Sequence, residues 1–421
     1  MKVLWFSPTP CGSLRKNSNQ VISGGWLISL EGLLKRQPDI ELSVAFFAKQ
    51  WESPFSYDGV VYYTMGYKKQ NAMRRVLNRL RSVESIDRIR LPWMMEVINL
   101  CKPDVIHIHG SEESFITILP KISGYPVIVS IQGMIAPLCE KFFSGVSKKD
   151  AYKFDSWSDR IHLTSICRIW KSSQQKAKRE NKYLSLAPNI IGRTFWDYNC
   201  TLAVNPNRKY YLVNEVLRDS FYEKTWKGQM SHETIQIIST ISGGIYKGYE
   251  TVLKVARILL GKSPVKFEWH IVGYGESSKW VRIAESITHI NHSEHNIILH
   301  GRLDENELSD LLCKSDIYVH VSHMENSPNS VCEAMLLGMP IIATYAGGTA
   351  SLLSHEEEGL LVQDGDPYVI AGGIINMMKN PDLAIKYGGL ARKRALQRHD
   401  KKEIVNTLIQ CYQDVWSSSK G

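Results

Sequence analysis

The chain repeats one local pattern along most of its length: a short apolar run that ends at a glycine or a polar turn, followed by a helical pattern. In the first half these runs are KVLWF, DVIHIHG and YPVIVSIQG. In the second half they are TIQIISTIS, FEWHIVGYG, NIILHGRL, DIYVHVS, PIIATY and GLLV. Continuous β-branched runs are typical of buried parallel strands. Their alternation with helices predicts an α/β protein built on parallel sheets.

Chain length and one irregular stretch suggest how the chain divides. Its 421 residues are enough for two or three domains of ordinary size. The aromatic-rich segment Asn205–Gln229 interrupts the repeated pattern, so we place a domain boundary there. We predict two Rossmann-like, doubly wound domains, 1–210 and 211–395, and a C-terminal helical segment, 396–421, that packs back on the first domain. Open sheets bind ligands beyond the carboxyl ends of their strands, so the two domains are expected to face each other across a cleft.

Composition excludes several classes of protein. Hydrophobic residues make up 43% of the chain and charged residues 22%, which indicates a folded protein of ordinary composition. No apolar run approaches the roughly 18 residues of a membrane span, and the start MKVLWFSPTPCG is too short and polar for a signal peptide. We therefore expect a cytoplasmic location. The eight cysteines are scattered without a CxxC pair, which argues against a disulfide framework and a zinc site.

The net charge of +9 suggests an anionic partner. Basic residues are densest from Lys68 to Arg90, where the helical spacing of apolar residues predicts a basic amphipathic helix (Met73, Val76, Leu77, Leu80 and Val83). Three interpretations stay open: a solvated helix face, a surface for anionic lipid, and a nucleic-acid site. Lysine and arginine gain roughly 1 kcal/mol each near an anionic membrane, so a peripheral position at its inner face is one expectation. Because no nucleic-acid module accompanies the segment, we predict no nucleic-acid partner.

The segment HMENSPNSVCEAMLLG, residues 323–338, carries two glutamates around a turn that opens a helix. Glu325 lies where the strand pattern DIYVHVS ends, and the free amides of the helix N-terminus attract phosphate. Glu333, about one helical turn inside, can accept hydrogen bonds from the vicinal hydroxyls of a ribose. Glu325 can bind a sugar on the far side of the phosphates. This is the layout of a nucleotide-sugar. The alternative is a capping box, with Glu333 on a solvated helix face.

The same stretch, continued by PIIATYAGGTASLLSHEEEGLLV, resembles the glutamate–seven–glutamate motif of glycosyltransferase family 4, retaining enzymes with the GT-B fold. The resemblance also takes in VGYGE, LHGRLDENEL, KPDVIHIHG, Lys247-Gly248 and Gly24-Gly25. It covers most of the second domain and the sheet of the first. The fold class that it implies is therefore GT-B.

The resemblance implies a role for each matching residue. Glu325 is expected to bind donor-sugar hydroxyls, Glu333 the ribose, and Lys247 the diphosphate. The other residues expected at the donor are Asn326, Ser327, Asn329 and Ser330 along the sugar and diphosphate, Leu303 at the base, and Gly24, Gly25 and Gly273, whose backbone approaches the ligand.

Two residues depart from the family pattern. Ser242 stands where the family usually has a phosphate-binding arginine, so that cation is missing or comes from elsewhere, with Arg193 or Arg218 as the candidates. Gln132 stands where many members have histidine. A histidine base is therefore impossible at this acceptor-side position. In a retaining front-face reaction, the departing phosphate can take the acceptor proton instead.

Two further sequence patterns concern histidines and a possible metal site. We expect His107 and His109 to point to opposite faces of their strand, with His107 packed and His109 near ligand. The sequence DGD at Asp364–Asp366 matches a metal-binding pattern of the other large glycosyltransferase fold. Its residues are ordinary turn formers, so we predict a turn there. We expect no metal and no other cofactor.

The sequence therefore predicts a retaining glycosyltransferase of bacterial surface-polysaccharide synthesis, such as that of a capsule or an O-antigen. It would move a hexose from a UDP or GDP sugar to a glycan or lipid-linked glycan. One alternative is a sugar-nucleotide epimerase or hydrolase, which would need an acid or base that Gln132 cannot supply. The other is a non-catalytic partner that binds nucleotide-sugar. Ser242 favours it, whereas Glu325, Glu333 and Lys247 argue against it.

Overall fold

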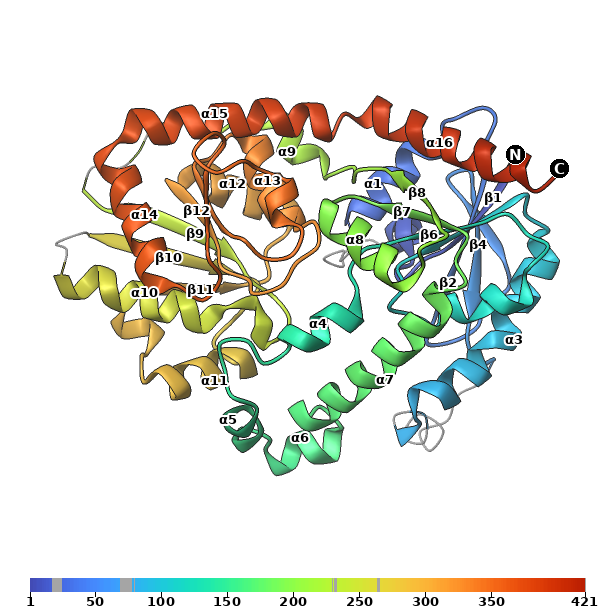
Figure 1. Cartoon of the computed structure of the whole chain (residues 1–421), viewed down its shortest axis with the longest axis horizontal. Helices are drawn as coiled ribbons and strands as arrows, with labels where there is room; N and C mark the ends of the chain where they lie inside the picture. The colour runs from blue at the N-terminus through green and yellow to red at the C-terminus, as the bar shows by residue number, and fades with distance from the viewer. Residues whose placement is uncertain are drawn as a thin grey trace. The chain divides into compact units, whose positions relative to one another are not determined.

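The chain forms two compact α/β units, coloured by residue number in Figure 1. The computed structural model describes residues 1–16, 25–68, 78, 80–228, 230, 233–262 and 266–420. The first unit comprises Met1–Cys139, Trp157–Val216 and Asp400–Gly421, and the second comprises Glu140–Ser156 and Leu217–His399. Residues 140–156 pass into the second unit, and the chain then returns to the first unit. It enters the second unit again at Val216/Leu217, inside the aromatic-rich stretch that interrupts the sequence pattern.

The first unit is built on an eight-stranded sheet with the order β3-β4-β2-β1-β5-β6-β7-β8. All neighbouring strands pair in parallel except β3 and β4, which are antiparallel. The strands are β1 (Lys2–Phe6), β2 (Glu41–Phe47), β3 (Phe55–Tyr57), β4 (Val60–Met65), β5 (Val105–His109), β6 (Val127–Ser130), β7 (Asn189–Gly192) and β8 (Lys209–Leu212). The predicted parallel sheet is confirmed, and the three runs predicted for this half are the buried strands β1, β5 and β6.

Helices pack on this sheet as an α/β architecture requires. α3 begins after Ser82, whose hydroxyl accepts a hydrogen bond from the backbone N–H of Ser85, and it ends at Lys102, which has a positive φ. The helical elements of this part of the chain are η1 (Cys11–Lys16), α1 (Gly25–Leu34), α3 (Val83–Cys101), η2 (Ser114–Lys121), α4 (Ile135–Lys141), α6 (Trp157–His162), α7 (Ile166–Leu184), α8 (Phe195–Val204) and α16 (Lys401–Ser418).

The C-terminal helix α16 belongs to the core of the first unit and runs beside α1 in Figure 1. Its buried face packs into the same apolar cluster as Val3 and Trp5 and consists of Ile404, Val405, Leu408, Cys411, Tyr412 and Val415. The hydroxyl of Tyr412 accepts a hydrogen bond from Trp5 Nε1 at 2.9 Å and lies 2.7 Å from His107 Nδ1. The last helix is thereby joined to the first and fifth strands of the sheet.

The second unit has a six-stranded, fully parallel sheet with the order β11-β10-β9-β12-β13-β14. Its strands are β9 (Ile235–Thr240), β10 (Phe267–Val272), β11 (Ile297–Gly301), β12 (Ile317–His320), β13 (Ile341–Thr344) and β14 (Leu360–Val362). Its helical elements are α5 (Lys148–Lys153), α9 (Asp219–Glu223), η3 (Ile245–Lys247), α10 (Tyr249–Lys262), α11 (Lys279–Thr288), η4 (His292–Glu294), α12 (Glu305–Lys314), α13 (Asn329–Leu337), η5 (Thr349–Ser351), α14 (Pro367–Lys379) and α15 (Pro381–Arg398). All six strands predicted for this half are present.

The segment Glu140–Ser156 packs with the second unit although it lies in the first half of the sequence. Phe142 is buried, with its ring 6.5 Å from that of Tyr246, and the Asp155 carboxylate lies 3.2 Å from Lys279 Nζ. The sequence alone placed these residues in the first domain.

The basic segment Lys68–Arg90 is described only in part. Met73, Val76 and Leu77 lie outside the described residues, so the predicted amphipathic helix is tested only from Leu80 onward. Leu80 is 55% exposed, Val83 is buried, and the regular helix α3 begins at Val83. Within the part of the chain that the structure describes, no helix is both long enough and apolar enough to span a membrane.

The hydrogen bonds of Tyr412 give a testable prediction for the stability of the first unit. Tyr412→Phe leaves Trp5 Nε1 and His107 Nδ1 without this partner in a buried site. An unsatisfied buried polar group costs about 1–3 kcal/mol, so the midpoint of thermal unfolding should fall by several degrees. Tyr198→Phe, at a partly exposed position of the same unit, should leave the midpoint within about 1 °C. Equal midpoints for Tyr412→Phe and wild type would contradict the prediction.

Candidate functional site

The strand order of the second sheet indicates where a ligand binds. From β9 the chain adds β10 and β11 on one side and then returns to add β12, β13 and β14 on the other. In open parallel sheets, ligands bind beyond the carboxyl ends of the strands where the order reverses. The reversal lies between β9 and β12, which are neighbours. The loop after β9 carries Lys247, and the loop after β12 carries Glu325.

Lys247 and Glu325, predicted from separate motifs, form an ion pair at this position. Lys247 Nζ donates a hydrogen bond to Glu325 Oε1, which also accepts one from Ser322 Oγ at 3.1 Å. His320 Nε2 lies 3.9 Å from the same oxygen. The side chains of Lys247 and Glu325 are 20% and 18% exposed, so the pair is shielded yet still accessible.

The pair determines the protonation state of Glu325. Burial alone would raise the pKa of this carboxyl, but the Lys247 ammonium, together with His320, outweighs it and lowers the pKa to about 2. For Lys247 the main opposing effects are burial, which lowers its pKa, and the negative charge of Glu325, which produces a net rise. Glu325 is therefore a carboxylate throughout the neutral range and acts as a hydrogen-bond acceptor.

Two glycines fix the backbone around this pair. Gly248, next to Lys247, has φ +78°, and a Cβ at this position would lie 2.0 Å from the carbonyl oxygen of Val321. Gly347, in the loop after β13, has φ +55°, and its Cβ would lie 2.0 Å from the carbonyl oxygen of Glu325. The same oxygen accepts a hydrogen bond from the Gly348 N–H at 3.0 Å. Only glycine allows this close packing, so three loops are held together.

Helix α13 begins directly after this loop. Its N-cap is Pro328, which makes no side-chain capping bond, so the capping-box alternative does not describe the helix start. The predicted residues Asn326 and Ser327 are buried in the preceding turn, and Asn329 and Ser330 form the first two helical positions. The helix dipole therefore places a partial positive charge at the side chains expected to follow the sugar and diphosphate.

Glu333 lies one turn inside α13, is buried, and pairs with Arg218. Arg218 donates from Nε at 2.9 Å and from Nη2 at 2.7 Å, in both cases to Glu333 Oε1. Burial raises the pKa of Glu333, and the guanidinium offsets part of that rise. The solvated-face alternative for Glu333 is therefore wrong. Arg218, one of the two candidates for the cation absent at Ser242, instead neutralises Glu333.

The other expected donor residues are distributed over both units. Leu303, after β11, packs against the core of the second unit, and Gly273 follows β10 with its N–H bonded to the Gly301 carbonyl oxygen at 2.6 Å. Gly25 begins α1 in the first unit, whereas Gly24 lies outside the described residues. Arg193 also belongs to the first unit, where its guanidinium lies 4.2 Å from the centre of the Trp26 ring.

The two histidines of β5 correct one prediction. Their ring centres are 3.8 Å apart, so His107 and His109 lie on the same face of the strand, as residues two apart must. Both are buried, and burial lowers the pKa of each, so both are neutral at pH 7. His107 lies 2.7 Å from the Tyr412 hydroxyl, as a packed residue should. His109 packs edge-on against Trp5 at 4.5 Å, and its ligand role stays a prediction.

Glu112, in the loop after β5, was missed by the sequence analysis. It accepts a hydrogen bond from the N–H of Gly133, next to Gln132, at 2.9 Å. Burial, followed by the nearby carboxylate of Glu180, raises its pKa to about 7 despite opposing backbone hydrogen bonds. The glutamine that replaces the family histidine thus lies beside a carboxyl that titrates near neutral pH. The signal for Glu112 in the sequence was its position just after the carboxyl end of a predicted strand.

A second missed cluster surrounds His323, two residues before Glu325. His323 Nε2 lies 2.9 Å from Glu250 and Nδ1 lies 3.1 Å from Asp364. The predicted turn at Asp364–Asp366 is present, since Gly365 has a positive φ and Asp366 caps α14. The contact of Asp364 with His323 was not predicted, because no sequence pattern connects residues 41 positions apart. A Cβ on Gly145 would meet both His323 and Glu250, so segment 140–156 covers this cluster.

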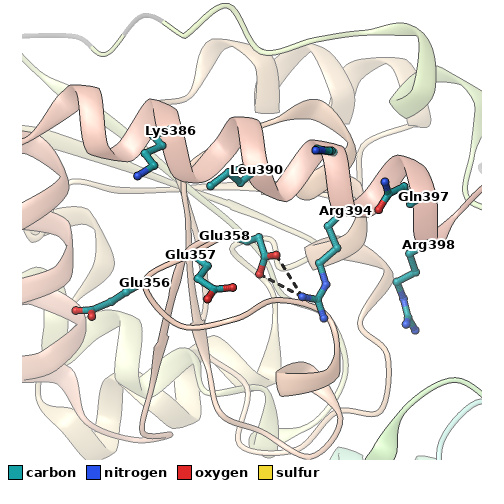
Figure 2. Close-up of a pocket in the computed structure, with 9 residues that line it drawn as sticks. Glu356, Glu357, Glu358, Lys386, Leu390, Arg394, Gln397 and Arg398 are labelled. Carbon is teal, nitrogen blue, oxygen red and sulfur yellow. Dashed lines mark hydrogen bonds and ion pairs between the residues drawn. The ribbon is translucent and has the colours of Figure 1, made fainter.

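The second unit also has a cavity away from the Lys247–Glu325 pair. Figure 2 shows its lining, which comes from α15 and from the loop that leads into β14 at its amino end. Its volume is about 760 Å³, and Glu356, Glu357 and Glu358 face basic side chains of α15 across it. Arg394 bonds to Glu358 at 3.2 Å, so the charges largely neutralise each other. This cavity does not include the loops that carry Lys247 and Glu325.

Two α/β domains built on parallel sheets form the GT-B fold. Solved structures with this fold match nearly the whole chain: sucrose-phosphate synthase from Thermosynechococcus elongatus has a TM-score of 0.71 at 14% identity and covers 99% of both chains. Anabaena HepE in complex with UDP and glucose has a TM-score of 0.64 at 16% identity and covers 97% of this chain and 98% of HepE.

Sequence comparisons show similarity to one family. Residues 223–394 match the family profile described as glycosyl transferases group 1. A 41.2 kDa protein in the cps region of Klebsiella pneumoniae is 22% identical over 343 residues, which are 79% of this chain and 84% of that protein. The profile match lies within the second unit, which is therefore similar to the group 1 glycosyl transferases.

The His323 cluster predicts a pH-dependent contribution to stability. Burial lowers the pKa of His323, but hydrogen bonds and charges from Glu250 and Asp364 raise it above 6.5. The contribution is therefore complete below pH 6.5 and is lost as the pH rises through the folded-state pKa. His323→Gln should lower the unfolding midpoint by several degrees at pH 6 and by less at pH 9. A difference that is the same at both pH values, or the same for the control His295→Gln, would contradict this account.

The raised pKa of Glu112 predicts the opposite pH dependence of stability in the first unit. Its carboxyl keeps its proton up to a pKa of about 7 in the folded state, against 4.5 in the unfolded chain. Stability therefore falls as the pH rises from 4.5 to 7 and stays reduced above 7. Glu112→Gln should raise the unfolding midpoint at pH 8 and leave it unchanged at pH 4.5. The exposed control Glu96→Gln should change it at neither pH, and a destabilised Glu112→Gln variant at pH 8 would refute the prediction.

Proposed function

We propose that the chain transfers a hexose from a nucleoside diphosphate sugar to a glycan or lipid-linked glycan, with retention of anomeric configuration. The Lys247–Glu325 ion pair at the switch point of the second sheet carries the proposal. The pair places the Glu325 carboxylate, which can accept hydrogen bonds from sugar hydroxyls, next to the Lys247 ammonium, which can bind phosphate. The α13 N-terminus follows in the same loop.

The pair has free hydrogen-bonding capacity for a donor. The ammonium group of Lys247 has three N–H donors, and one of them is directed at Glu325. The others are available to diphosphate oxygens, while Glu325 Oε2 is available to sugar hydroxyls. The partial positive charge at the α13 N-terminus adds to the attraction for the diphosphate.

Glu333 supplies the ribose contact in this proposal. Because both bonds from Arg218 go to Oε1, Glu333 Oε2 is the oxygen that can accept from a vicinal diol. The guanidinium also opposes the rise that burial causes in the pKa of Glu333 and so favours the charged carboxylate, which forms stronger hydrogen bonds with hydroxyls. Asn326, Ser327, Asn329 and Ser330 would follow the sugar and diphosphate, and Leu303 would pack on the base.

The reaction follows from these roles. The acceptor hydroxyl oxygen forms a bond to the anomeric carbon on the face from which the diphosphate leaves, so configuration is retained. The bond between the anomeric carbon and the phosphate oxygen breaks, and its electron pair goes to the diphosphate. The acceptor proton passes to the departing phosphate, which requires no base at Gln132. Lys247 and the helix amides stabilise the charge that develops, an effect commonly worth several kcal/mol.

The setting proposed is bacterial surface-polysaccharide synthesis at the inner face of the cytoplasmic membrane. The cps-region relative from Klebsiella pneumoniae supports the pathway class, and the UDP bound by Anabaena HepE makes UDP sugars the first donors to test, before GDP sugars. The basic segment Lys68–Arg90 supports a peripheral contact with anionic lipid.

Substitutions in the ion pair test the proposal. Glu325→Ala should abolish transfer of labelled sugar from a UDP- or GDP-sugar to a membrane acceptor fraction, because it removes the sugar contact and leaves Lys247 without its partner. Lys247→Ala should reduce transfer at least tenfold, which corresponds to about 1.4 kcal/mol of lost transition-state stabilisation. Glu268→Ala, at an exposed position of β10, should retain wild-type transfer. A near-normal rate for Glu325→Ala would reject the site.

The proposal also predicts independence from divalent metal. Lys247 and the α13 N-terminus take the place of a metal ion as the positive charge at the diphosphate. Transfer measured in excess EDTA should therefore remain within about twofold of the rate measured with added Mg²⁺. A loss of activity in EDTA that Mg²⁺ or Mn²⁺ restores would show that the charge at the leaving group is not supplied by the protein alone.

A further inference from the structure

A cavity of about 860 Å³ lies in the first unit between the N-terminal parts of α3 and α7. Seven arginine and lysine side chains line it, against two carboxylates, Asp87 and Glu113. Its other walls come from the residues after β5 and β6. The cavity on α15 is lined by similar numbers of acidic and basic side chains. The cavity between α3 and α7 differs from it in its excess of basic side chains.

Both carboxylates of the cavity are already neutralised. Arg179 Nη1 lies 2.9 Å from Asp87 Oδ1, and Glu113 is shared by Arg90 at 3.2 Å and Lys176 at 3.8 Å. Arg81 donates to the neutral groups of Tyr67 and Asn78. Among the described residues, Arg81, Arg160 and Lys171 have no carboxylate partner, so their charges are available to an anion from outside.

Arg179 also offers a buried donor. It is 8% exposed, and among the described residues its Nε has no hydrogen-bond partner, although both of its Nη atoms are bonded. A buried N–H without an acceptor costs free energy, which a bound anion would recover. The positive dipole ends of two 19-residue helices, α3 and α7, also face this region, and the Val83 N–H to Gln175 Oε1 bond of 3.3 Å joins them.

The cavity lies on the side of the sheet where ligands bind. α3 follows β4 and α7 precedes β7, so both helices begin at the carboxyl-end side of this parallel sheet. α6, which precedes α7 in Figure 1, contributes Arg160 to the cavity and exposes two large apolar side chains, Trp157 at 79% and Ile161 at 73%. Leu80, which is also exposed, lines the cavity itself.

We propose that this cavity binds the phosphate or diphosphate group of a lipid-linked acceptor, with the exposed apolar side chains beside the lipid. The inference rests on the proposed function, because it assigns that reaction's acceptor. A diphosphate that links a lipid to a glycan carries a negative charge on each phosphate, more than one carboxylate does, which suits a wall with cations such as Arg81, Arg160 and Lys171. Arginine forks match phosphate oxygens in geometry as well as in charge.

Calorimetric titration of the full chain tests the proposal. Lys247→Ala serves as the background, so that the proposed donor site does not bind the diphosphate probe. Three probes separate the two parts of the ligand: farnesyl diphosphate, inorganic pyrophosphate and farnesol. We expect farnesyl diphosphate to bind at least tenfold more tightly than pyrophosphate, and farnesol to show no measurable binding at the same concentration.

Charge-reversal substitutions in the cavity wall test whether farnesyl diphosphate binds there. Lys171→Glu combined with Arg160→Glu changes two exposed cavity-lining cations and should weaken farnesyl diphosphate binding at least tenfold. The matched control is Lys178→Glu, which is exposed on the same helix but does not line the cavity, and it should bind as the background does. Equal weakening by both variants, or no binding in the background, would overturn the proposal.

Two further arms separate the possible sources of phosphate and the two proposals. Flotation with phosphatidylglycerol vesicles that depends on Lys171 and Arg160, together with no binding of farnesyl diphosphate, would assign the cavity to bilayer head groups and overturn the acceptor assignment. Binding of UDP-glucose that is present with Lys247 intact and lost in Lys247→Ala reports on the donor site. Its failure would reject the proposed function, whereas a failure confined to farnesyl diphosphate would reject only this inference.

Discussion

The arrangement of the second unit depends on one ion pair, Lys247 with Glu325. Each charge lies in a largely shielded position, where an unpaired charge would be costly, so each side chain requires the other. The pair forms because two loops from neighbouring strands meet, and glycines allow their backbones to approach. Gly248 packs on the carbonyl oxygen of Val321, and Gly347 packs on that of Glu325. Helix α13 begins directly after the loop that carries Glu325, and it carries Glu333, which pairs with Arg218 at the start of α9.

The two units differ in how their charged side chains are paired. In the second unit the central carboxylates have basic partners: Glu325 pairs with Lys247, and Glu333 pairs with Arg218. In the first unit a buried carboxyl, Glu112, titrates near pH 7, and a cavity retains several cations without carboxylate partners. The second unit thus presents a fixed set of donors and acceptors for one ligand. The first presents a positively charged wall suited to an anionic one.

The sequence predicted the features that depend on local patterns. All nine predicted runs correspond to strands, whereas five strands of the first sheet, β2, β3, β4, β7 and β8, were not predicted. Glu325 was placed at a strand end and Glu333 in a helix start by the same logic, and Lys247 was assigned from the family resemblance. The sequence missed features that depend on contacts between distant residues. Segment 140–156 joins the second unit through Phe142 and Gly145, and no linker composition marks that crossing. The face of His109 was mispredicted from strand geometry, although residues two apart share a face.

The most direct test of the account is to measure how much the sugar contributes to donor binding. Calorimetry would compare UDP with UDP-glucose, and GDP with GDP-mannose, on wild type, Glu325→Gln and Glu333→Gln. The account predicts that wild type binds one sugar conjugate more tightly than its nucleoside diphosphate. Glu325→Gln should lose that difference while it keeps nucleoside diphosphate binding, and Glu333→Gln should weaken both ligands. If Glu325→Gln retains the full difference, or Glu333→Gln binds both ligands normally, the site assigned to these residues is wrong.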